Sequence, residues 1–205
     1  MFDHRTRSRR LRLAAATALT AGLALTVASV DHTAADGWEA RAVLRDTGGR
    51  KVGTVRFEGD GSGTDVKVTI SGLPGAVGAG WDAYHGLHVH AGDGTRRCDP
   101  VTNGAFMNVG AHWTAGMETH GNHDGDLPPV LVQADGSGSA RSRTGRFEPA
   151  DLIGRAVILH AGPDNLANVP TRYVTGTPPV AGPDTATKGT GDAGGRLACG
   201  VIERG

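Results

Sequence analysis

The order of apolar and polar residues along the chain contains eight short segments in which apolar residues alternate with polar ones or run together. Gly, Asp or Pro bounds these segments, and apolar segments of this length between turn residues are typical of β-strands. No stretch keeps a helical period over three turns. The predicted strands are residues 39–45, 51–57, 65–71, 87–90, 130–133, 139–144, 156–160 and 196–202.

The composition agrees with a fold that has many turns. The 205-residue chain contains 33 Gly, while aromatic residues make up only 4%. Because glycine permits the backbone conformations of tight turns, this balance favours short strands over long helices. We predict one all-β domain, a sandwich or a barrel. Two long stretches rich in Gly and polar residues, 91–129 and 161–195, interrupt the strands, and loops of this length are commonly functional.

The first 35 residues have the pattern of an export signal. Five arginines precede an apolar run of mostly small residues at 13–30. The alternative is a membrane anchor, but the run is slightly short for a span and a polar stretch follows it. We therefore expect a signal peptide at 1–35, a domain at 36–205 without a membrane span, and a secreted or cell-envelope location.

Removal of the signal changes the charge of the chain. Without the five arginines and two aspartates of residues 1–35, 16 basic and 19 acidic side chains remain, a net charge of about −3. No basic tract is left that would indicate nucleic-acid binding. The two cysteines, Cys98 and Cys199, are expected to form a disulfide, because exported proteins with an even cysteine count usually pair them.

Histidines cluster in the central and C-terminal parts of the chain. His88 and His90 flank one residue of a predicted strand, so their side chains point to the same face. His160 ends a second apolar strand, beside the second long stretch. Several imidazoles without thiolate or thioether neighbours suit copper, zinc or nickel. His120, His123 and Asp126 add a compact group of nitrogen and oxygen donors that suits zinc.

Three short elements of this sequence resemble the copper/zinc superoxide dismutase family. They are Gly86-Leu87-His88-Val89-His90, Gly110-Ala111-His112 and the C-terminal element at 191–202 that contains Arg196 and Cys199. The resemblance extends over about residues 38–203. It implies an eight-stranded Greek-key β-barrel or sandwich, and the dismutation of superoxide to dioxygen and hydrogen peroxide by a redox-cycling copper ion. The substrate would be superoxide, and a homodimer is one possible assembly.

The resemblance also implies a role for each site residue. Copper would be held by His88, His90, His112 and His160, and zinc by His112, His120, His123 and Asp126. His112 would bridge the two metals and act in catalysis together with Arg196, which would guide the anion. Asp164 would link ligands of the two metals, and His85 would be structural rather than a ligand.

One feature departs from the family pattern. Only Gly121 and Asn122 separate His120 from His123, whereas longer family members separate these two histidines widely. Copper-only members are known, so the sequence leaves both a copper–zinc pair and copper alone open. The main alternative function is an exported copper-binding or copper-buffering module without catalysis. A zinc-dependent hydrolase is a weaker alternative, since no general base stands beside a ligand.

Overall fold

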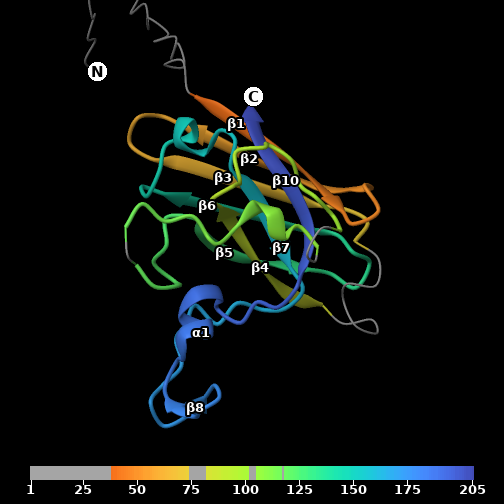
Figure 1. The fold of residues 1–205 in the computed structure, drawn as a ribbon. Helices are drawn as coiled ribbons and strands as arrows, with labels where there is room; N and C mark the ends of the chain where they lie inside the picture. The colour runs from red at the N-terminus through yellow and green to blue at the C-terminus, as the bar shows by residue number, and fades with distance from the viewer. Residues whose placement is uncertain (1–37, 74–81, 102–104, 117) are drawn as a thin grey trace, which may run out of the picture. The chain divides into compact units, whose positions relative to one another are not determined.

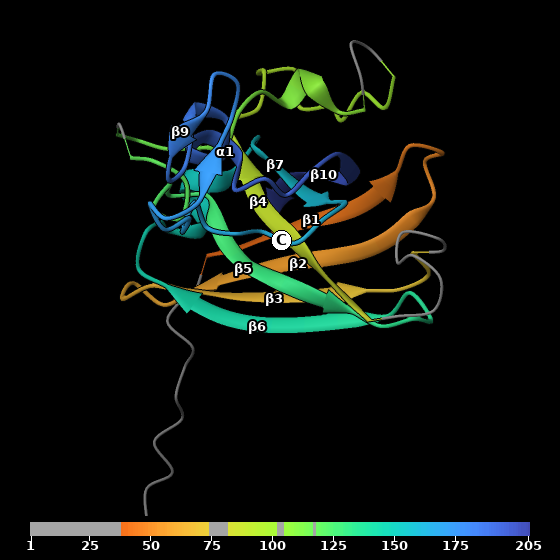
Figure 2. The same cartoon turned by 90° about the horizontal axis from the view of Figure 1, so that it is seen from below.

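Eight antiparallel strands form a closed barrel (Figures 1 and 2) in the computed structural model, which describes residues 38–73, 82–101, 105–116 and 118–205. The strands are β1 Glu39–Asp46, β2 Lys51–Gly59, β3 Thr64–Ile70, β4 Ala83–His90, β5 Asp126–Val132, β6 Gly138–Thr144, β7 Ala156–His160 and β10 Arg196–Arg204. Around the barrel they follow the order β1-β10-β7-β4-β5-β6-β3-β2.

The connections from β3 to β4 and from β6 to β7 join strands that are not neighbours in the barrel. Such crossovers are the mark of a Greek key, as opposed to an up-and-down barrel. The predicted all-β fold with an eight-stranded Greek-key barrel is therefore confirmed. All eight predicted strands are present.

Alternation along the strands fills the barrel interior. In β1, Ala40, Ala42 and Leu44 are buried, and the intervening residues are exposed or half-buried. Phe57 of β2 and Ile70 of β3 add large buried side chains to the same core cluster. Burying a Leu, Ile or Phe side chain stabilises a fold by about 1.5–3 kcal/mol relative to its exposure. This core makes the barrel a rigid base for its loops.

The neighbouring strands β4 and β7 are buried on both faces. Leu87, Val89 and Leu159 belong to the core cluster inside the barrel. Because side chains alternate between the faces of a strand, His88, His90 and His160 point to the opposite face. Ile158 on that face packs in a second, smaller cluster with Cys199. The histidines of two strands thus lie on one outer wall of the barrel.

Strand β5 begins earlier than predicted, because its first residues include two prolines that argue against a strand. The prediction begins at residue 130, whereas the strand begins at Asp126 and includes Pro128 and Pro129. Proline lacks the amide donor of a ladder and argues against a strand in a sequence. Here the pairing with β4 shifts register opposite the prolines, between His85 and Leu87. This shift makes room for both prolines.

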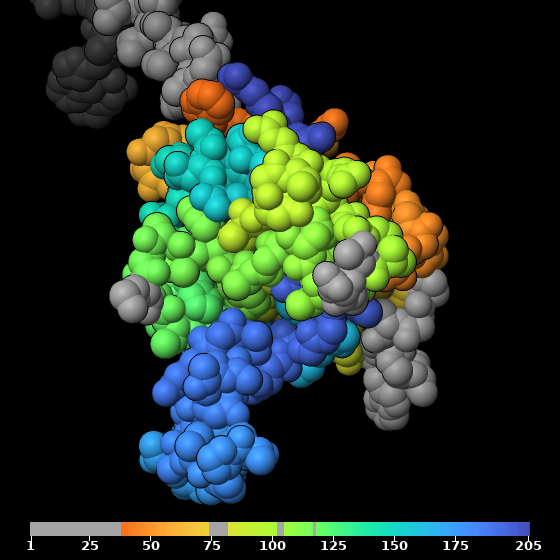
Figure 3. Space-filling model, viewed as in Figure 1, coloured from red at the N-terminus to blue at the C-terminus, as the bar shows by residue number. Residues whose placement is uncertain are grey.

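The two long stretches contain short elements that the sequence pattern did not predict. The first holds the 3-10 helix η2 Met107–Val109. The second holds a two-stranded sheet, β8 Val174–Thr175 with β9 Val180–Ala181, and the helix α1 Thr185–Thr190. A third turn of helix, η3 Pro149–Leu152, joins β6 to β7. The segment with α1 and β8, coloured blue, protrudes from one side of the barrel (Figures 1 and 3).

The predicted disulfide is present between Cys98 and Cys199, and it ties the first long stretch to β10. The signal peptide predicted at residues 1–35 lies outside the described residues. Within the described part of the chain, helices long and apolar enough to cross a membrane are absent.

Candidate metal centre

Seven buried side chains converge beside the outer wall of β4 and β7. Each is less than a tenth exposed, so water is largely excluded from the donors between them. The register of the barrel brings several together, since His88 lies opposite Asp126 and His90 forms an isolated bridge with His112. The seven residues are His88, His90, His112, His120, His123, Asp126 and His160.

A first group of donors consists of His88, His90, His112 and His160, whose ligand atoms lie within 4.8 Å of one another. His90 Nε2 is 3.4 Å from His160 Nε2. The other nitrogen of each ring contacts a main-chain oxygen: His90 Nδ1 donates to the Gly110 carbonyl at 2.9 Å and His160 Nδ1 to the Gly194 carbonyl at 3.1 Å. These bonds leave both Nε2 atoms free as acceptors for a metal.

His88 completes this group through its Nδ1 atom. His88 Nε2 contacts Asp164 Oδ2 at 2.5 Å, which turns Nδ1 toward the group. Nδ1 is fully buried and has no hydrogen-bond partner. A buried polar atom without a partner is costly, and a metal ion would satisfy it. The all-imidazole donor set is one that copper accepts, so these residues fit copper.

A second group surrounds Asp126 Oδ1. His112 Nδ1 and His120 Nδ1 each lie 3.2 Å from this oxygen and 3.2 Å from each other. His123 Nδ1 lies 3.3 Å from the same oxygen. Ligands about 2.0–2.1 Å from a tetrahedral zinc ion are about 3.3–3.4 Å apart by simple geometry. The group whose donors all lie within 4.8 Å of one another contains His88, His112, His120 and Asp126, and His123 approaches it through Asp126 Oδ1. The distances to Asp126 Oδ1 suit zinc despite the short spacing of His120 and His123.

Asp164 connects the two groups from the second long stretch. Its Oδ2 contacts His88 Nε2, and its Oδ1 contacts His120 Nε2 at 2.8 Å. The Leu166 amide donates to Oδ1 at 2.6 Å and fixes the carboxylate. The side chain of Asp164 is fully buried. One carboxylate thus contacts one ring from each donor group; the linking role that the family resemblance implies for Asp164 stays a prediction.

His85 lies outside both groups. It is fully buried, and its Nδ1 donates to the His160 carbonyl at 2.7 Å. It therefore contacts the main chain of a candidate ligand. Its Nε2 is buried without a hydrogen-bond partner, but His85 belongs to neither donor group. Its structural role stays a prediction.

The charge states of three histidines suit metal binding, whereas His120 must lose a proton to become a ligand. Burial lowers the pKa of His112 to about 4 and that of His160 to about 3, and it holds the pKa of His90 well below its usual value. These rings are neutral near pH 7, as ligands must be. His120 differs: burial lowers its pKa, but hydrogen bonds to Asp126 and Asp164 outweigh burial and raise the pKa to about 9.

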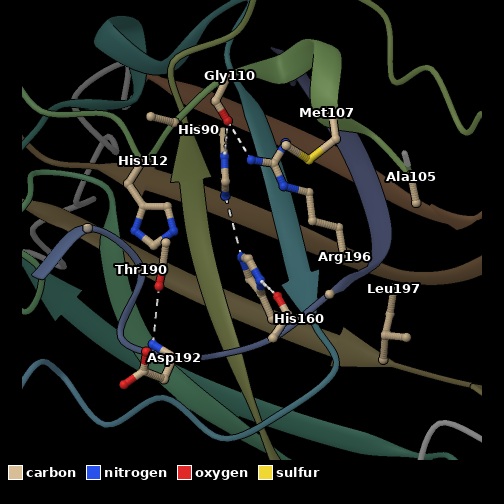
Figure 4. Close-up of a pocket in the computed structure, with 14 residues that line it drawn as sticks. His90, Ala105, Met107, Gly110, His112, His160, Thr190, Asp192, Arg196 and Leu197 are labelled. Carbon is tan, nitrogen blue, oxygen red and sulfur yellow. Dashed lines mark hydrogen bonds between the residues drawn. The ribbon is translucent and has the colours of Figure 1, made fainter. Parts of the chain in front are cut away.

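A cavity of about 970 Å³ opens onto the first donor group (Figure 4). His90, His112 and His160 line it together with Arg196, which pairs with His160 across the β7–β10 ladder. Arg196 donates to the carbonyls of Phe106 and Gly110, each at 2.6 Å. The guanidinium is thus held beside the imidazoles, where it can attract a small anion.

Two residues that support the site were not predicted from the sequence. Arg146 donates to three carbonyls of the segment that carries His120 and His123. The main-chain amide of Trp113, next to His112, donates to the Val89 carbonyl at 2.8 Å, and the Trp113 ring lies under the Arg155 guanidinium, 4.1 Å from the ring centroid. Adjacency to His112 could have pointed to Trp113, but no sequence signal marks Arg146, which is distant from the ligands along the chain.

Comparisons with known proteins agree with the geometry of the two donor groups. Residues 51–202 match the family described as copper/zinc superoxide dismutase (SODC). Superoxide dismutase [Cu-Zn] of Mycolicibacterium paratuberculosis is 37% identical over 172 residues, which cover 79% of this chain and 73% of that protein. Proteins of the same name from Mycobacterium bovis and Mycobacterium tuberculosis are each 39% identical over 170 residues, covering 77% of this chain and 67% of theirs. The chain therefore belongs to the copper/zinc superoxide dismutase family.

Proposed function

We propose that this chain converts two superoxide anions and two protons to dioxygen and hydrogen peroxide, with copper in the first donor group and zinc in the second. The observation that carries this function is the open cavity in which Arg196 stands beside three neutral imidazoles of one donor group. A copper ion bound there supplies the chemistry, because it alternates between two oxidation states. Nothing in the comparisons favours the non-catalytic alternative of copper storage.

In this proposal each side chain has one task. His88 Nδ1, His90 Nε2 and His160 Nε2 would hold copper. His112 directs Nδ1 to the second group, which leaves its Nε2 for the first, so its ring would be shared by both groups. When Nε2 is free of metal it accepts a proton, which places a proton donor beside the substrate. Arg196 attracts superoxide and orients it, and a cationic channel raises association rates about 10- to 1000-fold.

Zinc has a structural task in the same proposal. His120, His123 and Asp126 hold it together with His112, and no electron passes through it, since zinc has one stable oxidation state. His112 Nδ1, which lies 3.2 Å from Asp126 Oδ1, would be fixed by a zinc ion in the second group, and this would orient the His112 ring. Asp164 forms hydrogen bonds with both His120 and His88, so the orientations of these two rings depend on each other.

We also propose that the protein acts outside the cytoplasm after removal of residues 1–35. The disulfide supports this location, because such bonds persist in oxidising compartments. Superoxide that arises outside the membrane would then be its substrate. Mass spectrometry of the mature N-terminus in secreted and envelope fractions tests the location.

The function is tested by elemental analysis of the purified protein beside a superoxide-removal assay. Protein loaded with copper and zinc should remove superoxide, whereas protein loaded with zinc alone should not. His112→Ala should lose activity even where copper is retained. A copper-loaded wild-type protein without activity would favour the copper-buffering alternative.

A further inference from the structure

The segment that carries three candidate zinc ligands is unusually short. His120, His123 and Asp126 all lie within seven residues, and both imidazoles approach Asp126 Oδ1, His120 Nδ1 at 3.2 Å and His123 Nδ1 at 3.3 Å. The chain turns tightly here: the Asn122 amide donates to the Thr119 carbonyl at 3.0 Å, and the Asp126 amide to the His123 carbonyl at 3.1 Å. Gly121 has a positive φ of 89° and lies against Leu166. Such a segment needs outside support to hold this shape without metal.

Arg146 supplies contacts of this kind. Its Nη1 donates to the His123 carbonyl at 3.0 Å and to the Asp126 carbonyl at 3.3 Å, and its Nη2 donates to the Gly121 carbonyl at 3.2 Å. One rigid guanidinium therefore spans both ends of the turn. A lysine ammonium is a compact group that cannot reproduce the planar fork.

The backbone around Arg146 is fixed to the barrel. The Arg146 amide donates to Thr144 Oγ1 at 3.1 Å. The next residue, Phe147, is buried, and its ring centroid lies 6.1 Å from that of Phe57 and 5.9 Å from that of Trp113. Its carbonyl accepts a hydrogen bond from the buried Thr64 hydroxyl at 2.7 Å. The guanidinium thus extends from a rigid base to the metal-binding segment.

Asp126 complements Arg146 from inside the segment. Its Oδ2 accepts hydrogen bonds from the Gly121 amide at 2.7 Å and the His123 amide at 3.0 Å. Arg146 binds the carbonyls of the same two residues. The amide and the carbonyl of both residues are therefore engaged, and Asp126 Oδ1 is left to face the imidazoles.

We propose that Arg146 is a positioning residue that preorganises the zinc site before the metal arrives. It touches neither substrate nor metal, and it acts through the main chain of Gly121, His123 and Asp126. The inference rests on the zinc site of the proposed function. Partners of metal ligands contribute about 10- to 100-fold to metal affinity, and we expect an effect of that size here.

The test compares zinc affinity of wild type, Arg146→Ala and Arg146→Lys by competition with a chelator, in protein whose first group is already loaded with copper. Both variants should bind zinc about 10- to 100-fold more weakly and keep their copper. In the metal-free proteins, hydrogen exchange of the Gly121 and His123 amides should become faster, while amides of β2 and β3 stay protected. Exchange separates a local effect from a loss of the fold.

Arg143→Gln is the matched control, because Arg143 lies on β6 and pairs with Asp60 at 2.7 Å, away from the metal-binding segment. It should bind zinc as wild type does. Equal zinc affinity in wild type and Arg146→Ala would overturn the proposal. Zinc affinity equal to wild type in Arg146→Lys would overturn it too, because a positive charge without the planar fork would then be enough to support the zinc site. If Arg146→Ala does not fold, Arg146→Lys provides the test. Wild-type protein without dismutase activity would count against the proposed function and not against this inference.

Discussion

At the scale of single residues, the position of Arg196 depends on main-chain oxygens. The Gly110 carbonyl accepts from both Arg196 Nη2 and His90 Nδ1, so one peptide group orients a candidate copper ligand and the anion guide together. The Phe106 carbonyl holds Nη1. No ion pair with a carboxylate neutralises Arg196 among the described residues. Its positive charge therefore acts on the cavity.

Replacement of Arg196 tests this arrangement. Arg196→Gln should lower the dismutation rate about tenfold or more, because it removes the charge that concentrates superoxide at the site. Stopped-flow measurement over a range of ionic strength should show a weaker salt dependence than in wild type, with copper content unchanged. Arg141→Gln makes the same charge change at an exposed site on β6 and should have little effect. An unchanged rate and salt dependence in Arg196→Gln would rule out steering by this residue.

At the scale of elements, the register of the ladders assembles the site. His88 pairs with Asp126, and His160 pairs with Arg196. A shift of one residue in either ladder would turn these side chains to the opposite face. The disulfide adds a further constraint, since it joins β10 to the stretch that provides the Phe106 and Gly110 carbonyls.

Loss of the disulfide should therefore affect both stability and activity. The double variant Cys98→Ala/Cys199→Ala should lose about 2–5 kcal/mol of unfolding free energy, because the bond closes a long loop in the unfolded chain. Urea unfolding measures this loss. Activity should fall further than copper content, as the acceptors of Arg196 become less fixed. A reductant should weaken wild type in the same way and leave the variant unaffected; equal unfolding free energies of wild type and variant would contradict the prediction.

In the whole molecule, a rigid barrel supports a centre in which folding lowers the pKa of some histidines and raises that of another. His112 and His160 have folded pKa values of about 4 and about 3, below the unfolded value of about 6.5. Their contribution to stability is full above about pH 6.5 and is lost as the pH falls toward those values. His120, with a folded pKa of about 9, contributes fully below about pH 6.5 and loses its contribution as the pH rises through 9.

The metal-free protein should consequently be most stable near pH 6–7. Its unfolding free energy, measured by urea titration in the presence of a chelator, should decline on both sides of this range. Asp126 and Asp164 extend the acid decline, because hydrogen bonds to histidines outweigh burial and keep the pKa of each carboxyl below its usual value. His120→Gln should flatten the alkaline side, and it should also reduce the part of the acid decline that depends on the hydrogen bonds of His120 to Asp126 and Asp164. Stability that rises steadily from pH 6 to pH 9 would contradict this account.

The strands and the candidate ligands of this protein could be predicted from local patterns in the sequence. Alternation places residues such as Leu44 in the core, and the spacing of His88 and His90 puts two imidazoles on one face of a strand. Both features depend on residues that are close together in the chain, so they can be inferred from short stretches of sequence. The disulfide could also be predicted, because the chain has only two cysteines.

The contacts that support the site became apparent from the folded structure alone. The same holds for the distances between the donors of the short segment. Phe106 and Arg196 are 90 residues apart in sequence, and His120 and Asp164 are 44 apart. Arg146 binds main-chain carbonyls, which every residue type possesses, so no residue pattern could reveal its partners. Likewise, the three imidazole distances to Asp126 Oδ1 depend on how loops pack on the barrel. Sequence names the donors, but packing sets the distances between them.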